Sequence, residues 1–116
     1  MREVLERTRS VLLVERDPDL AVLLMDVLRE AGFDIEHVSD LGDAVVGEAD
    51  VVIVDCDGQR TPLAWLDHVE VHRVVVIAGV ARGLATGARA LGLPRVLEKP
   101  VEMSDLLAAL EPRLAM

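Results

Sequence analysis

The chain has 116 residues, 52% of them hydrophobic, and a net charge of −9 at pH 7. This length fits one domain around a single core, and the acidic balance argues against direct binding to nucleic acid. The sequence contains no run of 18 apolar residues and no signal-peptide pattern, and its single cysteine, Cys56, excludes an intramolecular disulfide. We therefore expect a cytoplasmic protein that does not enter the membrane.

Five short apolar segments alternate with five helical ones along the chain. The strong strand candidates are continuous runs of β-branched residues, which is typical of strands buried on both faces. They are residues 11–14, 51–54 and 74–78, with weaker candidates at 34–38 and 95–98. Helices are predicted over residues 18–32, 40–49, 61–70, 82–92 and 103–116.

The first predicted helix has the clearest boundaries. Asp17 is suited to cap its N-terminus, Pro18 to occupy its first turn, and Gly32 to end it. Residues 40–49, by contrast, contain two glycines and predict only a short, poor helix.

The alternation of strands and helices predicts an α/β fold, with a parallel sheet covered by helices on both faces. We expect residues 10–116 to form this domain and residues 1–9 to be a tail. In such sheets, ligands bind beyond the carboxyl ends of the strands.

Charged side chains follow three of the predicted strands, at the points where those strands end. These residues are Glu15, Arg16, Asp17, Asp55, Asp57 and Lys99. The first of these turns has acids where a nucleotide-binding loop needs glycines, so it would repel a bare phosphate group. The pattern indicates an acidic site with one lysine at the carboxyl edge of the sheet.

Four segments together resemble the receiver domain of bacterial two-component response regulators. They are "VLLVERDPD" (11–19), "VVIVD" (51–55), "VVVIAG" (74–79) and "VLEKP" (96–100), and the resemblance extends from about Val11 to Leu110. It implies a flavodoxin-like, doubly wound (βα)5 fold with a five-stranded parallel sheet in the order 2-1-3-4-5. It also implies a role in phosphorelay signal transduction.

The resemblance assigns roles to individual residues. Asp55 would be the phosphoacceptor, and Lys99, in a Lys-Pro motif with Pro100, would pair with the phosphoryl group. Mg²⁺, which prefers oxygen ligands, would be held by the acidic pair after the first strand, by Asp55 and by the backbone carbonyl of Asp57. Phosphoryl transfer to a carboxylate needs this cationic relief of charge.

Several positions depart from the family pattern. Arg16 replaces the second acid of the pair, and Arg can neither lose its proton nor ligate a metal. The two positions of the conformational switch fall on Ala78 and Val96, which lack the usual hydroxyl and aromatic ring, and Leu63 replaces a glycine. The chain therefore resembles an atypical receiver, or pseudo-receiver. We expect no cofactor, and at most weak Mg²⁺ binding through Glu15, Asp55 and the Asp57 backbone.

Alternative roles remain open for the charged residues. Arg16 either bridges Glu15 or Asp55 and replaces the metal ion, or it extends into solvent. Lys99 either binds phosphate or serves only as the ion-pair partner of Asp55. Asp17 is better explained as a helix cap than as a ligand, and Asp57 as a turn residue.

Three functions compete. The first is a non-enzymatic signalling module that contacts a kinase, an output domain or another signalling protein, or forms a homodimer, through residues 82–92, 95–98 and 103–116. The second is a phosphoacceptor, phosphorylated on Asp55 by a histidine kinase, with Mg²⁺ bound by Glu15, Asp17 and Asp55. The third is a phosphatase, since "VVIVDCDGQRT" also resembles the first motif of haloacid-dehalogenase-type enzymes. Asp55 would then be the nucleophile and Asp57 the general acid, but two strands precede a motif that normally begins that fold.

Overall fold

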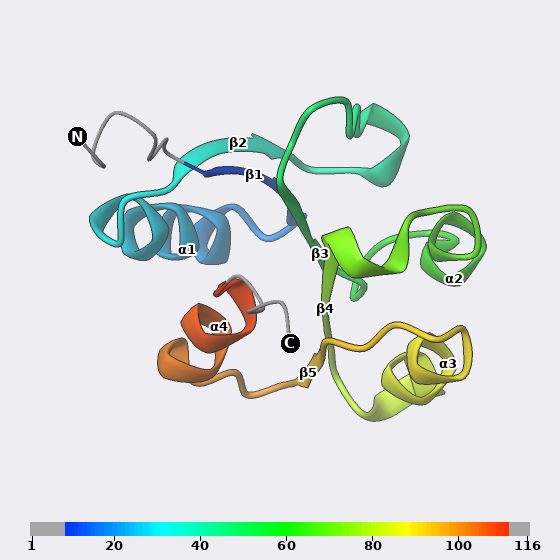
Figure 1. Ribbon diagram of the computed structural model, residues 1–116. Coiled ribbons are helices and arrows are strands. Elements are labelled where there is room, and N and C mark those ends of the chain that lie inside the picture. The colour runs from blue at the N-terminus through cyan, green and yellow to red at the C-terminus, as the bar shows by residue number, and fades with distance from the viewer. Residues whose placement is uncertain (1–8, 112–116) are drawn as a thin grey trace, which may run out of the picture.

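The computed structural model describes residues 9–111, which form a five-stranded sheet with helices on both faces (Figure 1). The strands are β1 Ser10–Val14, β2 Asp34–Val38, β3 Val51–Asp55, β4 Val74–Ala78 and β5 Val96–Glu98. They lie in the order β2-β1-β3-β4-β5, and all neighbouring strands are parallel. The predicted α/β fold and strand order are confirmed, including the two weaker strands at the edges.

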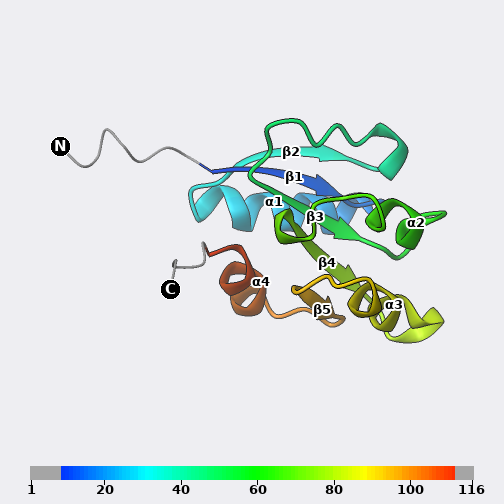
Figure 2. The same cartoon turned by 45° about the vertical axis from the view of Figure 1, so that its right-hand side comes forward.

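Four α-helices cover the sheet in the described part of the chain. They are α1 Pro18–Glu30, α2 Pro62–Leu66, α3 Leu84–Ala90 and α4 Met103–Leu110, and three short 3-10 helices are η2 Leu41–Asp43, η3 Val71–Arg73 and η4 Ala81–Gly83. Figure 1 shows α1 and α4 on one side of the sheet and α2 and α3 on the other. The strand arrows point the same way in Figure 2, so the loops after the strands share one edge.

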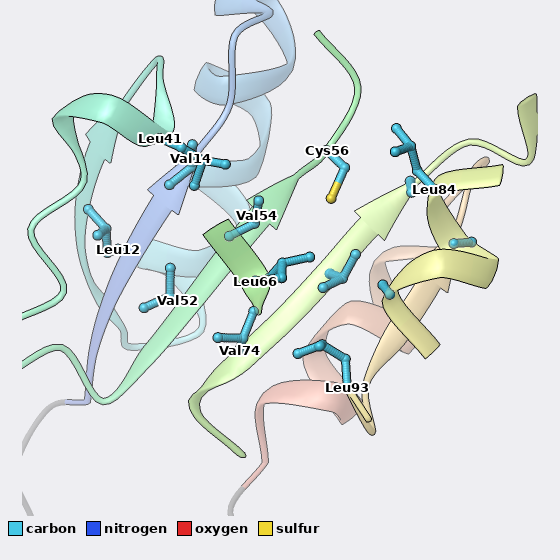
Figure 3. Packing of buried hydrophobic residues seen from close by; sticks show 14 residues of the cluster. Leu12, Val14, Leu41, Val52, Val54, Cys56, Leu66, Val74, Leu84 and Leu93 are labelled. Atoms are coloured by element: carbon cyan, nitrogen blue, oxygen red, sulfur yellow. The ribbon is translucent and has the colours of Figure 1, made fainter. Parts of the chain in front are cut away.

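Both faces of the central strands are buried. Every residue of β3 and β4 is buried, and alternate side chains belong to two separate clusters. Val52 and Val54 pack toward α2 and α3 (Figure 3), whereas Val51 and Ile53 pack toward α1 and α4. This double burial explains why the strands have continuous rather than alternating apolar sequences.

Helix α1 begins and ends where the sequence predicts. The Asp17 carboxylate accepts hydrogen bonds from the backbone N–H groups of Asp19 and Leu20, at 3.0 and 3.4 Å, and Pro18 is the first helical residue. The helix stops before Gly32, whose φ of +99° suits glycine because it has no Cβ. The cap interpretation of Asp17 is confirmed.

The helix predicted over residues 40–49 is wrong. Only the three-residue turn η2 forms there, and the rest of the segment is not helical up to β3. Gly42 and Gly47 each disfavour a helix by about 1 kcal/mol, and so short a segment cannot offset the cost of helix nucleation. The described chain therefore has four α-helices rather than the five predicted.

The N-terminal end of the described region contacts the start of β2 and the end of α4. Arg9, predicted to belong to a tail, accepts a hydrogen bond from the Asp34 N–H at 2.9 Å, and its guanidinium donates to the Leu110 carbonyl. The last predicted helix forms up to Leu110, and residues 1–8 and 112–116 lie outside the described range. Within residues 9–111, no helix has the length and apolar character required to cross a membrane.

Candidate functional site

The carboxyl ends of β1, β3, β4 and β5 bring the candidate residues to one edge of the sheet. Glu15 directly follows β1, Asp55 ends β3, and Lys99 directly follows β5. Asp55 pairs in register with Ile77 of β4, and Ala78 of β4 with Glu98 of β5, so these ends are level with one another. The predicted convergence of acids and a lysine is therefore seen in the fold.

Asp55 and Lys99 form the centre of this site. The Lys99 Nζ lies 2.7 Å from Asp55 Oδ2, and the Asp55 side chain is fully buried while that of Lys99 is 31% exposed. The other Asp55 oxygen, Oδ1, accepts a hydrogen bond from the Asp57 N–H at 3.0 Å. Burial alone would lower the pKa of Lys99, but the hydrogen bonds and negative charges of Asp55 and Asp57 outweigh it and raise the pKa.

Asp57 contributes its carboxylate as well as its backbone to the site. Its Oδ2 lies 2.9 Å from Lys99 Nζ and accepts a hydrogen bond from the Gly79 N–H at 3.1 Å. Gly79 directly follows β4, and a Cβ atom there would lie 3.3 Å from Asp57 Oδ2. The side chain of Asp57 thus connects the loop after β3 to the ends of both β4 and β5.

Glu15 is a buried acid beside Asp55. Its side chain is hydrogen-bonded to the Asp55 carboxyl group, and its Oε2 accepts a hydrogen bond from the Asp17 N–H at 3.1 Å. Its second oxygen, Oε1, is buried without a hydrogen-bond donor among the described residues. Burial, together with the hydrogen bond and negative charge of Asp55, raises the pKa of Glu15 from 4.5 to about 8. Glu15 therefore carries a proton at neutral pH.

Arg16 lies outside this cluster. Its guanidinium forms an ion pair with Asp40, and the two side chains are 49% and 46% exposed. Its aliphatic part runs beside Gly58, where a Cβ atom would be 3.3 Å from Arg16 Cδ. The hypothesis that Arg16 bridges Glu15 or Asp55 is not what the contacts show. The cation bound to Asp55 is Lys99.

The remaining predicted site positions have structural surroundings that explain them. Asp17 is exposed and caps α1, so its carboxylate is not part of the acidic pocket. Ala78 is fully buried and its carbonyl accepts the Lys99 N–H at 3.0 Å, while Val96 packs on the cluster beneath α3. Pro100 follows Lys99 through a cis peptide bond.

The residues present do not make a complete Mg²⁺ site. No group of three His, Cys, Asp or Glu side chains suited to a metal occurs among residues 9–111. Of the carboxylates at this edge, both Asp55 and Asp57 are bound by the Lys99 ammonium, and that of Asp17 caps α1. A hard dication needs several oxygen ligands, and Arg16 removes one without bringing its own charge to Asp55.

Cys56, between the two aspartates, is not a reactive thiol. Its side chain is fully buried and points into the cluster between the sheet and α2 and α3 (Figure 3). Burial and the neighbouring charges of Asp55 and Asp57 raise its pKa to about 12. Cys56 therefore behaves as a small apolar residue, because the thiolate is the reactive form.

Two residues of the site region were not found by sequence reasoning. Gly79 supplies a backbone N–H to Asp57, and a glycine directly after a buried strand was the available signal. Gln59 is 4% exposed; its Oε1 accepts from the Leu41 N–H at 3.0 Å and its Nε2 donates to the Ser39 carbonyl at 2.9 Å. Nothing in the sequence distinguishes Gln59 from an exposed loop glutamine.

Response regulators are among the solved structures that share this fold. A receiver domain from Clostridium thermocellum superposes with a TM-score of 0.74 and 20% identity, over 87% of this chain and 90% of that one. A putative response regulator from Chloroflexus aurantiacus superposes with a TM-score of 0.71 and 19% identity, over 88% of this chain and 93% of that one. NtrX from Brucella abortus, solved in complex with ADP, superposes with a TM-score of 0.73 and 24% identity, over 89% of this chain but only 26% of the NtrX chain.

This chain therefore has the flavodoxin-like fold of response regulator receiver domains. No protein-family model and no curated protein sequence matches it. Because the structural matches are below 25% identity, they establish the fold, and function has to be argued from the site.

Proposed function

We propose that this chain is a receiver-fold signalling module that acts through contacts with other proteins and catalyses no turnover. In it, Mg²⁺-dependent phosphorylation of Asp55 is weak or absent. The observation that carries the proposal is the pair of contacts at Lys99, whose Nζ lies 2.7 Å from Asp55 and 2.9 Å from Asp57. The Lys99 ammonium, which would pair with a phosphoryl group on Asp55, is already bound by two carboxylates.

The state of Asp55 also opposes attack on a phosphoryl donor. The side chain is fully buried, with Oδ1 bound by the Asp57 N–H and Oδ2 by Lys99. A carboxylate nucleophile has to approach the donor in line while cations offset the growing negative charge. Here the described residues supply one ammonium, that of Lys99, for the two carboxylates of Asp55 and Asp57, and the Arg16 guanidinium pairs with Asp40 instead. The balance of charge repels a phosphate dianion.

The proposed contact surface is the face formed by α3, β5 and α4. On it, Arg89 of α3 forms an ion pair with Glu98 of β5 at 2.7 Å, and both side chains are partly exposed. Leu106 and Leu110 of α4 are fully buried, so Leu107 is the α4 leucine left partly exposed to a partner. The partner is a kinase, an output domain, another signalling protein or a second copy of the chain. The proposal includes a cytoplasmic location, which suits the free, buried thiol of Cys56.

A phosphorylation assay tests the proposal directly. The chain is incubated with acetyl phosphate or phosphoramidate, with and without Mg²⁺, and its intact mass is measured beside a conventional receiver. We expect no gain of a phosphoryl group under conditions that modify the conventional receiver. A Mg²⁺-dependent gain that is absent in Asp55→Asn would overturn the proposal in favour of a working phosphoacceptor.

The Arg16→Asp variant tests why phosphorylation is weak. It restores an oxygen ligand beside Glu15 while leaving Asp55 and Lys99 in place. We expect Mg²⁺ affinity, followed by the NMR shift of the Asp55 amide, to rise at least about tenfold, a change of 1.4 kcal/mol. Arg29→Asp, an exposed arginine near the end of α1, is the matched control for a change of charge alone.

The phosphatase alternative has less support. Its general acid would be Asp57, but that carboxylate is bound by Lys99 and by the Gly79 N–H. Two strands, β1 and β2, also precede the strand that carries Asp55. Hydrolysis of a generic phosphate ester, abolished by Asp57→Ala, would establish this activity and overturn the non-enzymatic role.

A further inference from the structure

Two hydrogen-bond donors from different strands converge on the carboxylate of Asp57. One is the Lys99 ammonium after β5, 2.9 Å from Oδ2, and the other is the Gly79 N–H after β4, 3.1 Å from the same oxygen. An ammonium group and a backbone N–H aimed at one point form a binding site for a small anion. In this chain the anion is part of the protein.

The local backbone directs Asp57 into this position. Its own N–H donates to Asp55 Oδ1 at 3.0 Å, which fixes where the chain leaves β3. The next residue, Gly58, has φ of +83°, so the chain turns away without steric cost. Gly79 lacks the Cβ atom that would lie 3.3 Å from Asp57 Oδ2, so the carboxylate can approach its N–H. Residues on both sides of the contact therefore suit it.

An external anion would have to displace this carboxylate. Because Asp57 belongs to the same chain as Lys99 and Gly79, it competes with an external anion for them at an effective concentration on the order of millimolar or above. Its side chain is 36% exposed, so solvent ions reach it, but Lys99 is already neutralised by Asp55 and Asp57 together. A phosphate ion added to that arrangement would bring negative charge next to two carboxylates. The site favours its own carboxylate.

We propose that Asp57 is an internal ligand of an anion site formed by Lys99 and Gly79. By filling this site, Asp57 fastens the loop after β4 to β5 without any bound phosphate or phosphorylation. We call the contacts of Asp57 with Lys99 and Gly79 the latch. The loop that the latch holds, residues 79–83, contains Val80, which is 70% exposed, so the latch sets how this apolar side chain is presented to a partner. This inference deepens the proposed function, on which its regulatory meaning rests, by explaining how one conformation persists without an external signal.

NMR of the full chain tests the latch, with the Gly79 amide as the probe. In Asp57→Ala, we expect hydrogen exchange at the Gly79 N–H to accelerate at least about tenfold, because its acceptor is gone. In Asp57→Asn, which keeps an amide oxygen as acceptor, we expect exchange close to that of the wild type. Asp67→Ala, at an exposed aspartate just after α2, is the matched control and should leave Gly79 unchanged. Unchanged Gly79 exchange in Asp57→Ala would overturn the latch.

A titration with inorganic phosphate tests the anion site itself, without Mg²⁺ or a phosphoryl donor. We expect phosphate to shift the Gly79 amide in Asp57→Ala and to leave it unshifted in the wild type and in Asp67→Ala. An equal shift in the wild type, or none in a folded Asp57→Ala protein, would overturn the internal-ligand assignment. Phosphorylation of Asp55 in the separate acetyl phosphate assay would contradict the proposed function while leaving these two results intact, so the two failures are distinguishable.

Discussion

Two cations occupy the same edge of the sheet, and their surroundings differ. Lys99 is 31% exposed and lies within 2.9 Å of two carboxylates, one of them fully buried. Arg16 is 49% exposed and pairs with one carboxylate, Asp40, which is about as exposed as itself. In the sequence Arg16 is conspicuous because it lies in an acidic motif, but in the structure the cation that contacts Asp55 is Lys99.

This difference shows how Arg16 affects the site. Its charge is directed away from Asp55, so its main consequence is the loss of an oxygen ligand rather than the gain of a local cation. Lys99, in contrast, compensates a carboxylate that has no access to water. Breaking a buried pair leaves an uncompensated charge, whereas exposed pairs contribute little to stability. The two cations should therefore respond very differently to mutation.

Replacement of Lys99 should have the largest effect. In Lys99→Met, Asp55 stays buried without its cation, and we expect the free energy of unfolding at pH 7 to fall by about 3 kcal/mol. Urea unfolding measures this as a lower midpoint with an unchanged m-value. The double variant Lys99→Met/Asp55→Asn should recover most of the loss, because the buried charge is then gone and the remaining carboxylate, Asp57, is partly exposed and keeps the Gly79 N–H.

Arg89→Met is the matched control for Lys99→Met. Arg89 forms an ion pair of the same length, 2.7 Å, with Glu98, but both side chains are largely exposed. We expect its loss to cost less than about 1 kcal/mol. Equal losses in the two variants would show that burial of Asp55 does not set the role of Lys99.

Glu15 gives the stability a dependence on pH. Its pKa is about 8 in the folded protein and 4.5 ordinarily, so the folded state holds the proton more tightly than the unfolded state. This stabilisation is complete below pH 4.5 and is lost as pH rises toward 8. In Glu15→Gln, the uncharged amide should remove this loss, so its free energy of unfolding should fall less than that of the wild type between pH 4.5 and 8.

Urea unfolding of wild type and Glu15→Gln across this pH range measures the difference. Glu36→Gln, at an exposed position on β2, is the control and should retain the wild-type pH profile. Parallel pH profiles for wild type and Glu15→Gln would contradict the assignment of a protonated, buried Glu15.

Gln59 holds the loop that carries Asp40, the ion-pair partner of Arg16. Its two hydrogen bonds, to the Leu41 N–H and the Ser39 carbonyl, flank Asp40, the partner of Arg16. In Gln59→Ala both backbone groups lose their partner, and we expect a destabilisation of about 1 to 2 kcal/mol, measured by urea unfolding. Arg60→Ala, the exposed next residue, should change stability by less than about 0.5 kcal/mol. Similar values for the two variants would mean that water replaces the Gln59 contacts.

The strands and the first helix were predictable, because continuous apolar runs and caps are local signals. The meeting of Asp55 with Lys99 was predictable because both residues lie at the ends of parallel strands, which share one edge of the sheet. The direction of Arg16 was not, since it depends on Asp40 in a loop that replaces the predicted helix at 40–49. The substitution at Leu63 has a similar distant cause. A Cβ atom on Gly87 of α3 would lie only 2.6 Å from Leu63 Cδ1, so the space for this leucine comes from another helix. Pairings of this kind are not visible in either segment alone.

Arg16→Ala should have the smallest effect of these substitutions. The exposed pair with Asp40 contributes little because solvent and salt screen it, so we expect less than about 0.5 kcal/mol. A double-mutant cycle with Asp40→Ala, followed by urea unfolding at low and high salt, measures the coupling directly. A loss as large as that of Lys99→Met would mean that Arg16 compensates Asp55 in solution, and the division between the two cations would fail. A small coupling that fades with salt would leave Lys99 as the cation on which buried Asp55 depends.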